Sequence, residues 1–230
     1  MGKSTLGMDF TRSAAIRSKM PAAFFSLEMS SSEIVMRVLS AETGIDFNLI
    51  RTGKLSKPQW ENLALHMGQL ADCPLFIDDS PNLTMMEIRA KARRLKQRHN
   101  IQLLVVDYLQ LMTSGRKVEN RQQEVSEFSR QMKLLAKELE IPVVALSQLN
   151  RGPEGRQDKR PMLSDLRESG SLEQDADIVI LIHREEMYNT ETPRRGEADL
   201  IVAKHRNGAT RDVVVAFQGH RARFVNMQKV

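Results

Sequence analysis

The tetrapeptide Gly2-Lys3-Ser4-Thr5, directly after Met1, matches the second half of the phosphate-binding pattern G-x-x-x-x-G-K-[ST]. In that pattern the backbone N–H groups of a glycine-rich turn surround the phosphates, the lysine contacts the β- and γ-phosphates, and the hydroxyl binds Mg²⁺. Lys3 and Ser4 supply the lysine and the hydroxyl, whereas the first half of the turn is not in the chain. An ATPase is therefore the leading interpretation. The tetrapeptide also occurs by chance, so the rest of the sequence must support it.

Length and composition predict a folded, soluble, intracellular protein. The chain has 230 residues, of which 41% are hydrophobic, and this is enough for one large domain with a substantial core. The longest apolar runs, residues 143–146 and 178–182, have the length of strands and are too short to span a membrane. The single cysteine, Cys73, excludes an intramolecular disulfide framework and suits a reducing compartment.

The basic residues gather near the C-terminus. The net charge is +5, and residues 204–230 hold six basic residues and one acid, a difference of five. The six are Lys204, Arg206, Arg211, Arg221, Arg223 and Lys229, and the acid is Asp212. Such a region favours a polyanion, either nucleic acid or nucleotide phosphate, although charge alone fits a solvated surface equally well. A second basic cluster at residues 89–98 lies on a predicted helix and is interpreted as a solvated helix face.

The order of apolar patterns predicts an α/β fold with a mostly parallel sheet flanked by helices. Strands are expected at residues 22–27, 74–77, 101–106 and 143–147, with helices between them. Capping-box patterns at Ser30 and Thr84 mark two helix starts. Further strands at 178–182, 199–203, 213–217 and 222–225 follow with little helix between them, which predicts antiparallel pairing toward the C-terminus. The polar stretch 150–161 is predicted to be a loop. Residues 1–230 are predicted to form a single domain.

Polar residues that suit phosphoryl transfer follow four of the predicted strands. Such chemistry needs a phosphate site, a metal ligand, a group that orients water, and positive charge for the transition state. Glu28, Asp107 and Gln148 each follow a strand, and Lys204 and Arg206 follow another. Because ligands bind at the carboxyl ends of strands in open α/β sheets, these residues are candidates for one site.

Two acidic strand ends compete for the role of metal ligand. Asp107 follows the apolar run 103–106, and Asp78 and Asp79 follow the run 75–77. A carboxylate at a strand end also commonly caps the following turn. Spacing alone leaves this choice open.

Five motifs in order make a family resemblance specific. They are Ser26-Leu27-Glu28-Met29, Val105-Val106-Asp107-Tyr108-Leu109-Gln110-Leu111-Met112, Ser147-Gln148-Leu149-Asn150-Arg151, Asp165-Leu166-Arg167-Glu168-Ser169-Gly170-Ser171 and Lys204-His205-Arg206-Asn207-Gly208. Together they resemble the C-terminal, RecA-like motor domain of the bacterial replicative DNA helicases, the DnaB family, over nearly the whole chain. The resemblance favours Asp107 over Asp78 and Asp79 as the metal ligand.

The resemblance implies a nucleotide site with defined roles. The segment Gly2-Lys3-Ser4-Thr5 would bind ATP, with Ser4 and Asp107 holding Mg²⁺, the latter through a coordinated water. Glu28 would polarise the attacking water, and Gln148 would sense the γ-phosphate. Lys204 and Arg206 would reach into the site of a neighbouring subunit, which requires an oligomer, and the family forms a six-membered ring.

The resemblance also implies partners. Arg167, Glu168 and Gly170 match the family's central-channel loop, where single-stranded DNA would be followed along its phosphates, independently of sequence. Unwinding with 5′ to 3′ polarity, a cytoplasmic location at the replication fork, and primase and helicase-loader partners of a primosome are expected on the same ground. No membrane is implied.

Two other interpretations compete with a complete helicase motor. A RecA-like recombination ATPase shares the fold and the phosphate loop but lacks the Arg-Glu-Ser-Gly and Lys-His-Arg-Asn-Gly motifs. A catalytically impaired fragment is the other, because the family's N-terminal collar domain, its linker helix and the first strand of the sheet, which precedes the phosphate loop, have no counterpart in the sequence. On that view we expect the isolated chain to bind ATP and to form rings poorly.

Overall fold

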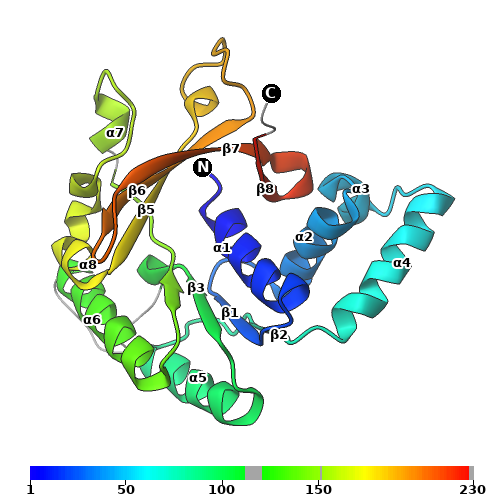
Figure 1. The fold of residues 1–230 in the computed structure, drawn as a ribbon, viewed down its shortest axis with the longest axis horizontal. Coiled ribbons are helices and arrows are strands. Elements are labelled where there is room, and N and C mark those ends of the chain that lie inside the picture. Colours follow the sequence, from blue (N-terminus) through cyan, green and yellow to red (C-terminus); the bar gives the residue numbers. More distant parts are fainter. Residues whose placement is uncertain (112–120, 151, 228–230) are drawn as a thin grey trace.

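The structure is a computed structural model, and it describes residues 1–111, 121–150 and 152–227 (Figure 1). A parallel four-stranded sheet lies at its centre, with the order β2-β1-β3-β4. Its strands are β1 (Ala22–Ser26), β2 (Leu75–Asp78), β3 (Leu103–Asp107) and β4 (Val143–Ala145). Strand β1 is buried along its whole length, as expected for a continuous apolar run in a sheet covered on both faces.

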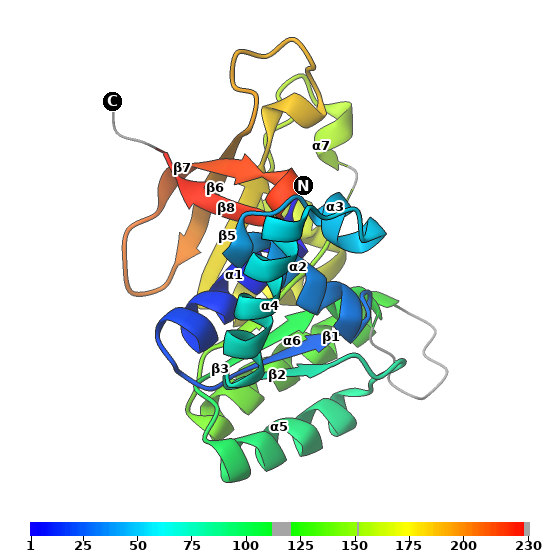
Figure 2. The ribbon, with the colours of Figure 1, turned by 90° about the vertical axis from the view of Figure 1, so that its right-hand side faces the viewer.

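Helices cover both faces of the parallel sheet. Figure 2 shows α5 on one side of β1, β2 and β3, and α1 and α2 on the other. The helices are α1 (Lys3–Arg12), α2 (Ser31–Thr43), α3 (Phe47–Thr52), α4 (Lys57–Ala71), α5 (Met85–His99), α6 (Arg121–Leu139), α7 (Gly152–Gly155) and α8 (Gly170–Asp175). In the described part of the chain, no helix is both long enough and apolar enough to cross a membrane.

Two apolar clusters fix these layers. Ile88 of α5 and Phe128 and Leu135 of α6 pack on one face of the parallel sheet. Met8 of α1 and Val38 of α2 pack on the other face. The helix that carries Lys3 is therefore held against the sheet by its buried side.

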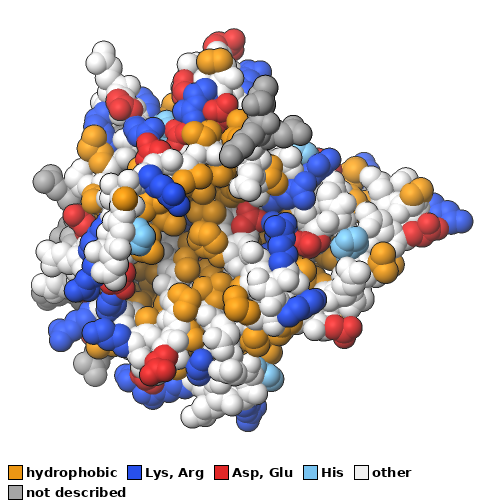
Figure 3. All heavy atoms as spheres, in the orientation of Figure 1, with side chains coloured by type: hydrophobic (Ala, Val, Ile, Leu, Met, Phe, Trp, Pro, Cys, Tyr) orange, Lys and Arg blue, Asp and Glu red, His pale blue; other side chains and the backbone are white. Residues whose placement is uncertain are grey.

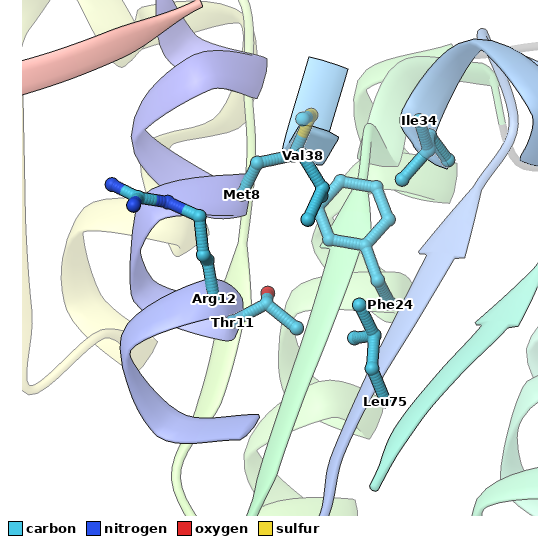
Figure 4. A pocket seen from close by; sticks show the side chains of 7 residues that line it. All are labelled: Met8, Thr11, Arg12, Phe24, Ile34, Val38 and Leu75. Atoms are coloured by element: carbon cyan, nitrogen blue, oxygen red, sulfur yellow. The ribbon is translucent and has the colours of Figure 1, made fainter. Parts of the chain in front are cut away.

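A small void remains beneath α1, where Met8, Phe24 and Val38 point toward one another (Figure 4). Its volume is about 10 Å³. A cavity of this size is at the lower limit for a single water molecule. The void therefore belongs to the core packing of α1 and is too small for a ligand.

The C-terminal strands form a separate antiparallel sheet with the order β5-β6-β7-β8. They are β5 (Ile178–His183), β6 (Glu197–His205), β7 (Arg211–Gln218) and β8 (Arg223–Asn226). The predicted fold class is confirmed, with the antiparallel strands in a sheet of their own. Among the described residues, β4 and β5 are each paired on one side only. Figure 3 shows hydrophobic side chains gathered in the hollow between the two sheets.

Three local expectations need correction. The Thr84 capping box forms with Glu87, but at Ser30 only the hydroxyl accepts from the Glu33 N–H, because the Glu33 carboxylate pairs with Arg37 instead. The predicted loop 150–161 contains the short helix α7. The basic residues of α5 are more than a solvated face.

Three basic side chains of α5 have partners on neighbouring elements. Arg89 and Arg93 pair with Glu138 of α6, and Lys91 pairs with Asp78 at the end of β2. Such cross-element pairs cannot be read from the periodicity of one helix.

Candidate functional site

The site begins where α1 begins. Gly2 precedes the helix with φ 108°, a conformation that L side chains rarely adopt. A Cβ at Gly2 would also lie 2.9 Å from the ring of Phe224 and 3.2 Å from that of Phe217. Glycine is therefore required here by backbone conformation and by space. The first N–H groups of α1 have no acceptor within the helix, and such a helix start is a ready site for an anion.

Lys3 brings the ends of two strands together. Its Nζ lies 3.0 Å from Asp107 Oδ1, 3.4 Å from Glu28 Oε2 and 3.5 Å from the centroid of the Tyr108 ring. Strands β1 and β3 are neighbours with Ser26 opposite Asp107, so Glu28, two residues further on, lies beside the same strand end. Three of the predicted site residues thus converge at the carboxyl edge of the parallel sheet.

Asp107 is fully buried and only half satisfied. Its Oδ1 accepts from Lys3, whereas its Oδ2 has no hydrogen-bond partner among the described residues. A buried carboxylate oxygen without a partner is costly, and such atoms are rare in proteins without a functional reason.

A hard cation would satisfy this oxygen. Mg²⁺ prefers oxygen ligands and is held by one or two carboxylates together with substrate phosphates, so Asp107 and the Ser4 hydroxyl fit it. The described residues contain no cluster of three or more His, Cys, Asp or Glu suited to a metal. The donor set therefore fits a cation that arrives with a phosphate ligand.

Two residues of the site were missed by sequence reasoning. The Tyr108 ring lies against Lys3, and its pKa is raised by burial and by the nearby charges of Glu28 and Asp107. Gln110 donates to Ser147 Oγ at 2.7 Å and to the Gln148 carbonyl at 3.0 Å, and its Oε1 accepts from the Gln148 N–H. Gln110 thereby joins the ends of β3 and β4. Both residues stand shortly after Asp107, which was the available signal.

The competing acids at the end of β2 have structural partners. Asp78 Oδ2 accepts from Lys91 and Asp78 Oδ1 from the N–H of Ser80, while Asp79 accepts from the N–H of Ser31 in the first turn of α2. These are capping and pairing roles. Among these acids, Asp107 is the one that lies with Lys3.

Lys204 and Arg206 lie with a different part of the fold. Lys204 Nζ donates to the carbonyls of Glu173 and Gln174 in the last turns of α8, at 2.6 and 3.2 Å. Arg206 lies 3.4 Å from Asp177 and is largely exposed. In the described part of the chain neither residue shares a partner with Lys3.

The predicted DNA-binding residues lie in a helical segment. The backbone of Arg167 and Glu168 belongs to the 3₁₀ turn Leu163–Ser169, and Gly170 begins α8. The side chains of Arg167 and Glu168 lie outside the described part of the structure. The turn is anchored by buried Asp165, which accepts from Arg156 and from the N–H of Met162.

A lysine at the start of the first helix and a buried carboxylate at the end of a parallel strand define a RecA-like P-loop NTPase domain. Residues 1–226 match the family described as the DnaB-like helicase C-terminal domain, and the chain belongs to this family.

Relatives and solved structures agree with the family. The replicative DNA helicase DnaB of Mycobacterium intracellulare is 65% identical over 226 residues, which cover 98% of this chain and 39% of that protein. A solved structure of an ATPase domain superimposes with a TM-score of 0.94 at 33% identity, covering 99% of this chain and 81% of that one. A DnaB-like replicative helicase, described with its interactions with primase, gives a TM-score of 0.92 at 34% identity over 99% of this chain and 55% of that one. The chain spans about half the length, or less, of the curated relatives it matches.

Proposed function

We propose that the chain is the motor of a replicative helicase, which hydrolyses ATP to move 5′ to 3′ along single-stranded DNA and to unwind the duplex at a bacterial replication fork. The observation that carries the proposal is the junction at Lys3, whose ammonium touches both Glu28 and Asp107 at the ends of neighbouring strands. Family membership supports the same reaction class.

The chain's own groups account for nucleotide binding. The N–H groups at the start of α1 would hold the phosphates, and Lys3 would exchange its carboxylate partners for the β- and γ-phosphates. Ser4 and Asp107 would hold Mg²⁺, which when bound neutralises charge on the phosphates. Asp107 would then gain a partner for the oxygen that has none among the described residues.

Glu28 is proposed to orient and polarise the water that attacks the γ-phosphate. Its side chain is 48% exposed and lies two residues beyond the end of β1, so solvent water has access to its carboxylate. Gln148 would sense the γ-phosphate. Its backbone N–H and carbonyl are hydrogen-bonded to the side chain of Gln110, which lies shortly after the strand that ends in Asp107.

The positive charge for the transition state is proposed to come from another copy. Lys204 and Arg206 would act in the nucleotide site of the neighbouring copy in a hexameric ring. The segment 163–170, which includes Arg167, Glu168 and Gly170, would contact DNA in the central channel of that ring. One of the solved helicases that the chain resembles is described with its interactions with primase, which supports the proposal of primase as a partner in the bacterial cytoplasm. A helicase loader is proposed on the family resemblance.

Glu28→Gln tests the chemistry. We expect ATP hydrolysis to fall by roughly 10²–10⁴-fold, the usual contribution of a positioned base, with nucleotide binding retained. Glu33→Gln, which removes a surface carboxylate paired with Arg37 on α2, is the matched control and should hydrolyse ATP normally. Equal rates for the two variants would contradict the role of Glu28. A strand-displacement assay on a forked duplex separates a helicase from a recombination ATPase, which would hydrolyse ATP without unwinding.

A further inference from the structure

Helix α8 lies between the segment that is proposed to bind DNA and the residues Lys204 and Arg206, which are proposed to act on ATP. Its first residue, Gly170, continues the 3₁₀ turn Leu163–Ser169, which holds the proposed DNA segment. The carbonyls of Glu173 and Gln174 in its last turns accept from Lys204. One short helix therefore connects the proposed DNA segment with the end of β6.

Asp177, two residues after α8, holds Arg206 by two different groups. Its carbonyl accepts from the Arg206 N–H at 2.8 Å, and its carboxylate lies 3.4 Å from the Arg206 guanidinium. The same carboxylate also pairs with Lys133 of α6. Asp177 thus joins α6, the end of α8 and the end of β6 at one point.

We propose that Asp177 is a positioning residue for Arg206, and that through it a change in the 163–175 segment reaches Arg206. The proposal rests on the proposed function, because it assigns DNA to that segment and transition-state charge to Arg206. When DNA displaces the segment, α8 and the residues after it would move, and Asp177 would carry the movement to Arg206 through the backbone and the side chain.

The surroundings of Asp177 favour positioning over stabilisation. The carboxylate is 53% exposed and the Arg206 side chain is 67% exposed, and ion pairs at such exposure contribute little to folding. Asp177, Arg206, Lys133 and Lys137 line a groove of about 440 Å³ between α6 and the end of β6. The Arg206 side chain therefore has room for several directions in this open groove, and the pairing with Asp177 selects one of them. The pKa of Asp177 is lowered by the hydrogen bond from Lys133, so the carboxylate is charged at neutral pH.

Hydrogen exchange tests the proposal without requiring ATP turnover. Addition of saturating oligo-dT to the unaltered chain should slow exchange in residues 163–175 and in residues 204–208 together. In Asp177→Asn the first segment should still respond, and the response of the second should be clearly smaller, because the carboxylate pair is removed while the hydrogen bond from the Arg206 N–H to the carbonyl of residue 177 remains. The proposal is overturned if residues 204–208 respond equally in the variant, or if they do not respond in the unaltered chain. No response in either segment would refute DNA binding at this segment and the proposal with it.

The second measurement is the ratio of ATP hydrolysis with and without oligo-dT. We expect this ratio to fall about fivefold or more in Asp177→Asn, the lower end of typical coupling between two sites. Glu138→Gln is the matched control, since that carboxylate also bridges two cations, Arg89 and Arg93, but joins α5 to α6 instead. An unchanged ratio in Asp177→Asn overturns the proposal. If the unaltered chain hydrolyses no ATP, the proposed function fails, and the exchange measurement still decides whether Asp177 transmits the response.

Discussion

Replacing Lys3 with methionine should leave a carboxylate buried without a counter-charge. Asp107 is fully buried, and Lys3 is its hydrogen-bonding side-chain partner among the described residues. Removing one partner of a buried ion pair costs about 3–5 kcal/mol. The Lys3 side chain is 23% exposed, so water partly compensates, and we expect a loss of about 2–3 kcal/mol. In a domain of this size that corresponds to a fall in Tm of roughly 4–12 °C.

The assay is urea unfolding followed by far-UV circular dichroism without nucleotide, with Tm measured in parallel. The second variant is Lys3→Met/Asp107→Asn, in which the buried charge is also removed. It should recover more than about half of the lost free energy of unfolding, because a neutral amide is less costly to bury than an unpaired carboxylate. The two changes should therefore be non-additive by more than about 1 kcal/mol.

Lys91→Met is the control for the loss of a lysine from an ion pair. Lys91 pairs with Asp78 at 2.6 Å, but both side chains are partly exposed, so the cost should stay below about 1 kcal/mol. The reasoning would be refuted if Lys3→Met lowered the free energy of unfolding no more than Lys91→Met does. Additivity of the Lys3 and Asp107 changes within about 0.5 kcal/mol would also refute it.

Three further predictions concern the surrounding fold. Gly2→Ala should lower Tm more than Gly53→Ala in differential scanning fluorimetry. Both glycines have positive φ, but only at Gly2 would an added Cβ lie 2.9 Å from a ring, and this overpacking should cost about 1–3 kcal/mol more. Similar Tm shifts for the two variants would contradict this prediction. The hydrogen bond from Arg194 lowers the pKa of Asp199. The ionised carboxylate therefore stabilises the fold above about pH 4, and this stabilisation is lost as the pH falls through the folded-state pKa. Asp199→Asn should therefore show a flatter loss of stability below pH ~4 in urea titrations. Ile178 is 50% exposed on edge strand β5, so Ile178→Lys should reduce self-association in sedimentation velocity, whereas Leu65→Lys on α4 should change it less.

The strands and the long helices were predictable because their signals are local. A buried parallel strand is a continuous apolar run, and α6 shows its stripe of buried residues directly in the sequence. The positions of Glu28 and Asp107 followed from the same logic, since strand ends meet at one edge of a parallel sheet. The pairing of β1 with β3 brings them to Lys3 as that rule requires.

The side-chain partners could not be predicted because they depend on which elements become neighbours. Gln110 acts on β4 only because β3 and β4 are adjacent, and no spacing in the sequence states this. Likewise, the periodicity of α5 predicts which side chains face outward but not that Glu138 of α6 lies opposite Arg89 and Arg93. Antiparallel pairing toward the C-terminus was predicted, but the separation of these strands into a sheet of their own was not, because pairing between strands is a long-range property.

The distribution of charge bears on the proposal that a neighbouring copy completes the nucleotide site. The Lys3 cluster contains one lysine against the two carboxylates of Glu28 and Asp107, so negative charge is already in excess there before phosphates arrive. A triphosphate at α1 adds negative charge there, and the available cations at the end of β6 are held by α8 and Asp177. Under the proposed function, Mg²⁺ would compensate part of this charge, and Lys204 and Arg206 of a second copy would supply the rest, since Lys3 and Arg206 share no partner among the described residues. The same separation would make hydrolysis depend on how the copies are arranged, and under the proposed function a DNA strand that passed by the 163–175 segment of each copy would influence that arrangement.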